Sequence, residues 1–444
     1  MKHIAIVSIL FSALSISWAH GAYAGDTPYI AVGKAKAEKA VIAMPEIRTG
    51  GNRELATLGK EISDTVTNDL NFMDMFKFLG SSAFVEDTSK AGITLDQFKL
   101  SDWTSIGAKL LIKSQLSSQN GNLVLESYLY DTYGARQLLG KRFVALRSDV
   151  KTLAHSLANS VVEALTQQPG IFLTKIAMSC ERNHRKEIYM MNFDGSDVKQ
   201  VTQHHSIAFA PAWNPDGNKL AYSVYAKHRG NIKNIDLFEF DFRTSTYKVI
   251  SNRKGINSGA AYNPDRSGHI ALTMSFLGNP EIFVFNPGAD TVTRLTKSFG
   301  FDVDPVYSPD GKSLAFVSSR SGQPMIYRMN ADGSNVKRLT YAGHYNATPT
   351  WSPMNNKIGF AGDIDGHFDI FIMNPDGTNI ERLTKGQGNN EDPNFSPDGN
   401  FLVFSSNRTG QANIYVMNVD GTYVKRLTYG LGNCSSPKWS LPPK

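Results

Sequence analysis

The 444-residue chain lacks the residue patterns that most often mark a catalytic or metal-binding protein. It has two cysteines and contains no Cys-x-x-Cys, His-Glu-x-x-His or Gly-x-Ser-x-Gly sequence. The common zinc sites and the nucleophile elbow of the α/β-hydrolases are therefore excluded. Its Asp-Gly pairs lack the alternating carboxylates and the final glutamate of an EF-hand loop, so we interpret them as turns. We expect no catalytic residue, no metal and no cofactor.

The chain also has little net charge and few long apolar runs. Its formal charge of +6 is small for this length and no Lys/Arg block stands out, which argues against nucleic acid as a partner. The longest apolar run, residues 4–18, follows Lys2 and His3 and precedes Ala22-Tyr23-Ala24. This order predicts a secretory signal over residues 1–24. No later run is long enough to span a membrane, so we expect an exported, soluble monomer without a transmembrane segment.

What the sequence does contain is a sixfold repeat. An aromatic residue leads into a Pro-Asp-Gly-like turn in each copy, at spacings of 49, 45, 44, 44 and 44 residues. The six aromatics are Trp213, Tyr262, Tyr307, Trp351, Phe395 and Trp439. Each period then reads as further strands, two of them apolar, and Asn-x-Asp-Gly turns followed by an Arg-Leu-Thr strand recur at 330–340, 374–384 and 418–428. A period of this length and chemistry predicts a β-propeller with four-stranded blades.

The two ends of the repeat region complement each other. Residues 175–202 supply strands two to four of a blade, and residues 437–440 supply a first strand alone. Joined, they make a sixth blade and close the ring, which removes the open edge of a linear array. Cys180 and Cys434 then become neighbours across this seam. Two alternatives follow: a disulfide that staples the ring, or two separate buried thiols.

An α/β domain precedes the propeller. Residues 25–38 are small, polar and Lys-rich, which is typical of an extended arm, and residues 39–168 form the domain. Apolar stripes predict helices over 54–75, capped by Asn52, and over 150–166. Strands are expected at 40–47, 76–79, 107–116, 123–130 and 141–146. Gln167 to Gly170 marks the boundary, and the propeller occupies 171–444.

One face of the ring gathers polar loop residues. The 49-residue period has five extra residues within 227–233, in a connection between strands two and three. That connection shares a face with the entries to the first strands. Charged candidates on this mouth are His228, Arg229, Asp302, Asp304, Arg320, Glu391, Asp392 and Arg408. They form either a binding site for a polar protein partner or merely solvated loop ends.

With an export signal, an α/β domain and a six-blade ring in this order, and with its repeated Trp/Phe-Ser-Pro-Asp-Gly-like and Asn-x-Asp-Gly…Arg-Leu-Thr segments, the chain resembles the TolB family of Tol-Pal system proteins. The resemblance implies a periplasmic, non-enzymatic adaptor of Gram-negative bacteria that supports outer-membrane invagination at cell division and outer-membrane integrity. Its implied partners are the peptidoglycan-associated lipoprotein Pal at the mouth, TolA at the arm, and outer-membrane proteins. By repeat position it adds Phe209, Ser258 and Thr348 to the mouth residues Asp302, Asp304, Glu391 and Asp392. It assigns the TolA contact to the arm, with Asp26, Thr27, Tyr29, Ile30 and Val32 as candidates.

Two other functions remain open on the sequence alone. A propeller enzyme of the lactonase or sialidase kind would need inward side chains that converge around a metal or an arginine cluster. An envelope carbohydrate-binding protein would need exposed aromatics at the mouth, where Phe209, Phe301 and Tyr345 qualify.

Overall fold

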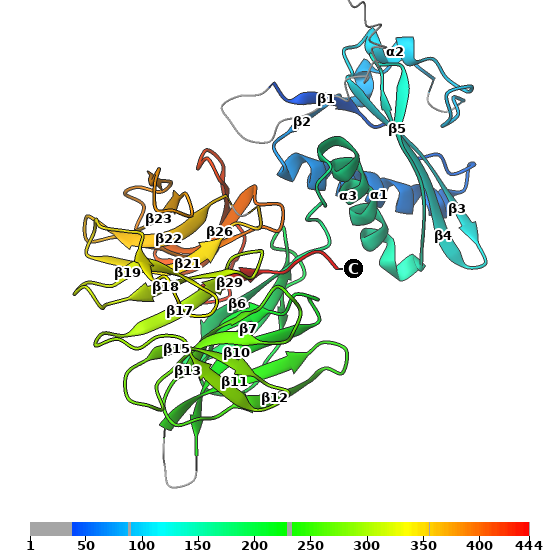
Figure 1. Cartoon of the computed structure of the whole chain (residues 1–444). Coiled ribbons are helices and arrows are strands. Elements are labelled where there is room, and N and C mark those ends of the chain that lie inside the picture. The colour runs from blue at the N-terminus through cyan, green and yellow to red at the C-terminus, as the bar shows by residue number, and fades with distance from the viewer. Residues whose placement is uncertain (1–37, 88–89, 229–232, 355, 444) are drawn as a thin grey trace, which may run out of the picture.

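The structure is a computed structural model that describes residues 38–87, 90–228, 233–354 and 356–443 (Figure 1). An α/β domain comes first in the chain, and a ring of six small sheets follows it. The predicted fold class, an N-terminal α/β domain followed by a six-bladed propeller, is confirmed.

The α/β domain is built on one five-stranded sheet in the order β2-β1-β3-β4-β5. Two long helices, α1 and α3, share one apolar core with this sheet, and a short helix and two 3-10 turns complete the domain. The elements are β1 (Ala40–Ala43), α1 (Arg53–Phe72), β2 (Phe76–Phe78), η1 (Ser81–Ala83), α2 (Leu100–Thr104), β3 (Leu110–Gln119), β4 (Asn122–Asp131), β5 (Arg136–Ala145), η2 (Arg147–Asp149) and α3 (Val150–Thr166).

Local signals in the sequence explain most of these elements. The Asn52 side chain caps α1 by accepting a hydrogen bond from the Leu55 amide at 3.1 Å, as expected. The β3–β4 hairpin turns at Asn120-Gly121, both with positive φ. The expected boundary of β5 was wrong: it begins at Arg136, five residues before the predicted 141. This edge strand is largely exposed, so its first half has no apolar alternation to reveal it.

The propeller consists of six antiparallel four-stranded sheets. From the innermost strand outward the first three sheets are β9 (Ala208–Trp213), β10 (Lys219–Lys227), β11 (Lys233–Asp241), β12 (Thr246–Ser251); β13 (Asn257–Tyr262), β14 (Ile270–Met274), β15 (Glu281–Asn286), β16 (Thr291–Arg294); and β17 (Asp302–Tyr307), β18 (Ser313–Ser318), β19 (Met325–Asn330), β20 (Lys337–Arg338). The other three are β21 (Tyr345–Trp351), β22 (Ile358–Asp363), β23 (Phe368–Met373), β24 (Glu381–Arg382); β25 (Asn390–Phe395), β26 (Phe401–Thr409), β27 (Gln411–Asn418), β28 (Val424–Arg426); and β29 (Asn433–Trp439), β6 (Lys175–Arg182), β7 (Arg185–Asn192), β8 (Lys199–Gln200).

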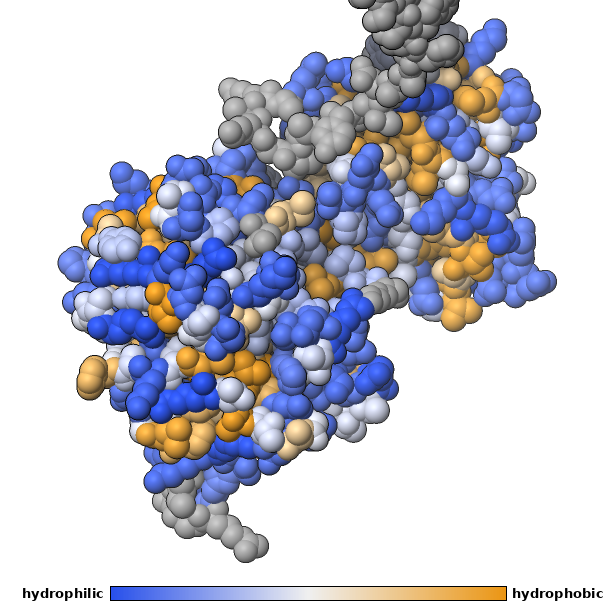
Figure 2. Space-filling view, in the orientation of Figure 1, coloured by the Kyte–Doolittle hydropathy of each residue, from blue (hydrophilic) through white to orange (hydrophobic). Residues whose placement is uncertain are grey.

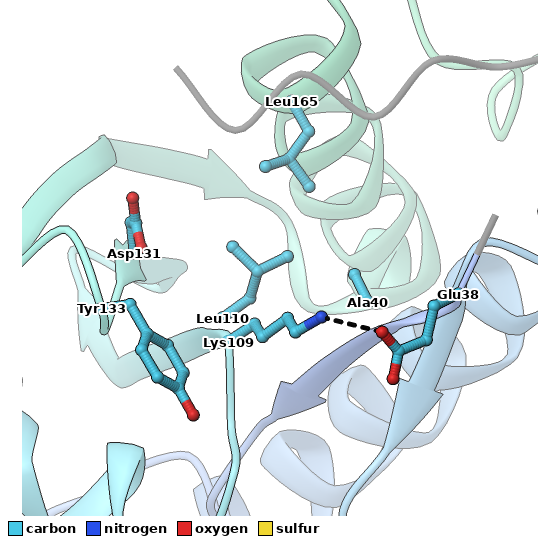
Figure 3. A pocket seen from close by; sticks show the side chains of 7 residues that line it. All are labelled: Glu38, Ala40, Lys109, Leu110, Asp131, Tyr133 and Leu165. Carbon is cyan, nitrogen blue, oxygen red and sulfur yellow. Dashed lines mark hydrogen bonds and ion pairs between the residues drawn. The ribbon is translucent and has the colours of Figure 1, made fainter. Parts of the chain in front are cut away.

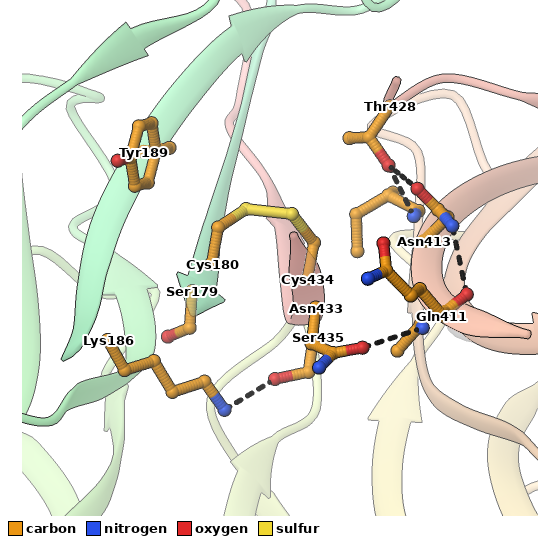
Figure 4. The surroundings of a disulfide bond; sticks show 12 residues. Ser179, Cys180, Lys186, Tyr189, Gln411, Asn413, Thr428, Asn433, Cys434 and Ser435 are labelled. Atoms are coloured by element: carbon orange, nitrogen blue, oxygen red, sulfur yellow. Dashed lines mark hydrogen bonds between the residues drawn. A yellow bond between two sulfur atoms is a disulfide. The ribbon is translucent and has the colours of Figure 1, made fainter. Parts of the chain in front are cut away.

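The last of these sheets is the composite blade that closes the ring. The C-terminal strand β29 pairs with β6, and Cys434 lies opposite Cys180 in the register. The two sulfur atoms are bonded, and the cross-link joins residues 254 positions apart (Figure 4). Trp439 adds a hydrogen bond from its indole N–H to Thr174 Oγ1 at 2.7 Å. The seam thus combines strand pairing, a covalent bond and a buried aromatic.

The repeated Arg-Leu-Thr segment clamps the start of the third strand in its own blade. Thr296 Oγ1 accepts a hydrogen bond from the Ile282 amide and donates one to Glu281 Oε2 at 2.6 Å. Arg294 reaches the same carboxylate at 2.9 Å. Equivalent threonines bond the same amide in four other blades, namely Thr202, Thr340, Thr384 and Thr428. The motif is therefore structural.

The Asp-Gly turns hold neighbouring blades together. Gly333, with φ +88°, sits against the preceding blade, where an added Cβ would lie 2.7 Å from the Leu295 carbonyl oxygen. Gly195, Gly377 and Gly421 meet a leucine carbonyl oxygen of the adjacent blade in the same way. Only glycine combines the positive φ with this close approach.

The α/β domain contacts the end of the ring opposite the predicted mouth. Phe193, in the turn between β7 and β8, packs edge-on against Phe72 of α1 and against Phe172 of the connection between the domains. Phe401, at the start of β26, also contacts Phe72. These propeller residues belong to turns between strands one and two or three and four, so the α/β domain packs on the end of the ring that carries those turns.

Candidate partner-binding site at the propeller mouth

Every innermost strand carries the same bulge. Its register against the second strand shifts near the third or fourth residue, and that residue has a positive φ of between 47° and 62°. These six residues, called here the channel ring, are Ala210, Gly259, Asp304, Thr348, Asp392 and Ser436. A positive φ costs a non-glycine residue about 1 kcal/mol or more. Its presence at five non-glycine positions indicates that the bulge is a built feature of the mouth.

The bulges bring side chains of adjacent blades together around the channel. Asp392 Oδ2 accepts hydrogen bonds from the Ser436 amide at 2.9 Å and from its hydroxyl at 3.2 Å. A Cβ added at Gly259 would lie 2.9 Å from Asp304 Oδ1. The channel ring therefore brings neighbouring blades into contact at Asp392 with Ser436 and at Asp304 with Gly259.

Carboxylates in this surface are poorly solvated. Burial raises the pKa of Asp304 to about 6, and the negative charge of Asp392 adds to the effect. The pKa of Glu391, the residue before Asp392, is raised by the same two causes. No hydrogen bond reaches the Asp304 carboxylate from any part of the chain that the structure describes. Thus one acidic group of the ring has its acceptor capacity unused.

Two lysines face these carboxylates. Burial lowers the pKa of Lys438, although Asp392 and Asp304 act in the opposite direction. Burial likewise lowers the pKa of Lys186, whose Nζ donates to Ser435 Oγ at 2.8 Å (Figure 4). The mouth is thus a mixed-charge surface.

Asp304 should lower the stability of the folded protein at neutral pH. Because its folded pKa of about 6 lies above the ordinary 3.8, the folded state binds more protons between these values and loses stability as pH rises through the window. Asp304→Asn should therefore raise the melting temperature above pH 6, by roughly 2–4 °C for about 1 kcal/mol. The gain should fade as pH falls toward 4. Thermal scans of both proteins from pH 4 to 8 measure it, and a variant that melts lower at pH 7.5 would contradict the assignment.

The structure divides the mouth candidates into three groups, of which the first lies at the channel. Asp304, Thr348 and Asp392 belong to the channel ring, and Phe209, Ser258 and Glu391 lie one residue before its members in their strands. All six are partly buried at the channel.

The other charged candidates are engaged within the fold. Asp302 is completely buried and accepts a hydrogen bond from Arg320 at 2.8 Å. Arg408 donates to Asn390 Oδ1 at 2.7 Å and stacks on Phe404 and Tyr415. Asp302 and Arg320 form an ion pair that supports a strand entry, whereas Arg408 is held by neutral partners and keeps its charge.

The remaining candidates lie away from the ring or outside the described part of the chain. His228 Nε2 lies 2.9 Å from Asp236 Oδ2, beside the β10–β11 hairpin. Arg229 and the arm residues Asp26, Thr27, Tyr29, Ile30 and Val32 are outside the described residues. Lys186, Ser436 and Lys438 were missed by the sequence analysis, although alignment of β29 with the other first strands could have found the last two.

Neither a metal centre nor a catalytic group emerges from the described residues. No cluster of three or more His, Cys, Asp or Glu side chains among them could hold a metal ion. A cavity of about 380 Å³ lies in the α/β domain, lined by Glu38, Ala40, Lys109, Leu110, Asp131, Tyr133 and Leu165 (Figure 3). Its lining is mostly apolar, and Lys109 pairs with Glu38 at 3.4 Å. The cavity contains no nucleophile with a neighbouring base.

Comparison with known proteins decides the family. The model of the TolB beta propeller domain matches residues 162–361 and 346–444, and that of the TolB amino-terminal domain matches residues 28–138. The chain belongs to the TolB family. A "Protein TolB homolog" of Chlorobium chlorochromatii is 33% identical over 72% of this chain and 70% of that protein. A "Tol-Pal system protein TolB" of Desulfosudis oleivorans is 34% identical over 61% of each.

Solved structures agree with this assignment. TolB from Acinetobacter baumannii superposes with a TM-score of 0.78 and 26% identity, covering 93% of this chain and 99% of that one. Membership of the TolB family supports a role in the Tol-Pal system. No helix in the described ranges has both the length and the apolar character to cross a membrane.

Proposed function

We propose that this TolB-family chain is a non-enzymatic periplasmic adaptor, which binds Pal at the propeller mouth and TolA through residues 25–38. In this role it supports outer-membrane invagination at division and outer-membrane integrity. The observation that carries the Pal contact is the channel ring. The half-buried carboxylate of Asp304 accepts no hydrogen bond in the free protein and lies near Lys438, whose pKa is lowered by burial. Such an unpaired carboxylate lowers the stability of the free protein, and hydrogen-bond donors of a bound partner would remove this cost.

Glu391 and Asp392 extend this surface toward the loop entries. Both are partly buried, and the charge of Asp392 acts on Lys186 and Lys438. Such a surface suits a partner that carries matching charges and hydrogen-bonding groups, because complementary polar contacts set specificity.

Charge reversal should separate the mouth from the rest of the molecule. Asp304→Lys with Glu391→Lys should weaken Pal binding at least about tenfold, which is about 1.4 kcal/mol, as measured by calorimetry with the soluble domain of Pal. The matched control is Glu163→Lys with Glu381→Lys, the same charge change at exposed positions outside the mouth. Unaltered Pal affinity in the mouth variant, or equal losses in both variants, would refute the assignment.

A deletion variant tests whether the arm, residues 25–38, binds TolA. A variant that lacks residues 25–36 should lose TolA capture and keep Pal binding, because the arm and the mouth are separate contacts in the proposal. Retained TolA capture would refute the arm's role, and the Pal result would be unaffected by it.

A further inference from the structure

The blade formed by β9 to β12 departs from the other five at its outer edge. Its outermost strand β12 has six residues, whereas the other outer strands have two to four. The register explains the difference. The slot opposite the repeated aromatic of strand three (Phe283, Tyr327, Phe371, Tyr415 and Tyr189) holds Arg294, Arg338, Arg382 and Arg426 in four blades and Gln200 in the composite blade. In β12 this slot holds Val249, opposite Phe238.

Each outermost strand of the propeller pairs on one side only within the described residues, and β12 is the longest of these edges. In the next blade Arg294 bends back to the buried Glu281 at the start of β15. The equivalent acid here, Asp236, is instead bonded by Asn234 at 2.6 Å and by His228. Because Asp236 already has these partners, Val249 stays in β12 and the strand is longer. Within the described residues β12 pairs with β11 alone, so alternate backbone N–H and C=O groups along it point outward.

Side chains along this edge alternate between apolar and basic. Tyr247 and Val249, two residues apart and so on one face, are 51% and 45% exposed. Lys248 lies between them, 3.9 Å from Glu239, a carboxylate that Lys219 already binds at 2.9 Å. Residues 246–254 carry three basic side chains and no acidic one. On the face of the propeller seen in Figure 2, hydrophilic surface is interspersed with hydrophobic surface.

A cavity of about 520 Å³ runs beside the strand. Its lining comes from residues 248–253 and from Pro287 and Asp290 of the next blade. Arg253 closes one side, bonded to Asp290 at 2.8 Å and stacked over Phe285. Lys254 follows it and is exposed. The edge therefore has space for one more chain alongside it.

From these observations we infer that β12 is a second docking site, where an acidic polypeptide segment adds in extended form as a fifth strand of the blade. Backbone pairing would supply the affinity, Tyr247 and Val249 would contact apolar residues of the segment, and Lys248 and Lys254 would pair with its carboxylates. This surface lies on the outer edge of a blade, apart from the channel, and the inference does not depend on Pal binding at the mouth.

The test uses the full exported chain and an eight-residue peptide of alternating Glu and Val, labelled for fluorescence anisotropy. The peptide should bind, and Lys248→Glu with Lys254→Glu should weaken binding at least about tenfold. Lys337→Glu, which changes the equivalent slot of a two-residue outer strand, is the matched control and should have no effect. The variant Asp304→Lys with Glu391→Lys should still bind the peptide, so the test of the β12 edge is independent of the test of the mouth.

Several outcomes would overturn the inference. A peptide with N-methyl groups at alternate residues cannot pair with the edge, so its binding as tightly as the parent would exclude strand addition. A Lys-Val peptide that binds equally well would exclude the charge argument. Binding of phosphatidylglycerol vesicles that depends on Lys248 and Lys254, with no peptide binding, would assign the edge to lipid instead.

Discussion

Reduction of the Cys180–Cys434 bond should lower the free energy of unfolding of the propeller by about 2–5 kcal/mol. The bond spans 254 residues, so cutting it releases a very long loop in the unfolded chain. Both cysteines are buried within the seam, where β29 pairs with β6. Breaking the bond leaves that pairing to hold the ring without a covalent link.

The measurement is chemical denaturation of the wild type with and without a reductant, followed by tryptophan fluorescence, since Trp439 and Trp213 both lie at the seam. The matched control is Cys180→Ala with Cys434→Ala. This variant should start at the lower stability and show no response to the reductant. A wild type whose unfolding midpoint is the same in both conditions would show that the disulfide does not stabilise the ring.

Gly333→Ala should destabilise the propeller by about 3 kcal/mol, the sum of an unfavourable φ and a backbone collision. At φ +88° an alanine is strained, and its Cβ would lie 2.7 Å from the Leu295 carbonyl oxygen of the adjacent blade. This oxygen is part of the backbone, so the contact is relieved only by moving two blades apart.

Gly366 provides the control for the φ term alone. It has a φ of +80° and no atom within 4 Å of an added Cβ. Gly366→Ala should therefore lose about 1 kcal/mol, the value of the φ strain by itself. Equal losses in the two variants would contradict the view that Asp-Gly turns act by joining blades.

The architecture was predictable because its signals are local and repeated. A fixed period, Pro-Asp-Gly turns and a first strand separated from its partners are visible in the sequence, and together they predict the number of blades and the closing seam. The expectation that Asp-Gly pairs are turns holds for the same reason, since glycine at positive φ is a local requirement.

The mouth was less predictable, because its geometry depends on a bulge that no single residue type marks. Ala210, Asp304, Thr348 and Ser436 differ in chemistry, yet all adopt the same positive φ. Asp302 and Asp304 are two residues apart and look alike in sequence. The first is buried against Arg320, and the second is partly open to the channel without a donor. Tertiary context, which sequence spacing does not contain, decides which carboxylate faces a partner.

Lys186 is a second residue whose place in the site cannot be predicted from the sequence. It belongs to β7, the third strand of the composite blade, and reaches the channel only because β29 brings Ser435 next to it. The sequence separates these two residues by 249 positions. The repeat pattern predicts that the ring closes. Which side chains meet at the seam is known only from the folded structure.

Hydrogen–deuterium exchange of the mature protein with and without Pal tests the central claim, that the channel ring and its neighbours form the partner-binding surface. The account predicts slower exchange on Pal binding in the first halves of the six innermost strands, around residues 209–210, 258–259, 303–304, 347–348, 391–392 and 435–436. Protection confined to the α/β domain or to outer strands, with these segments unchanged, would contradict it.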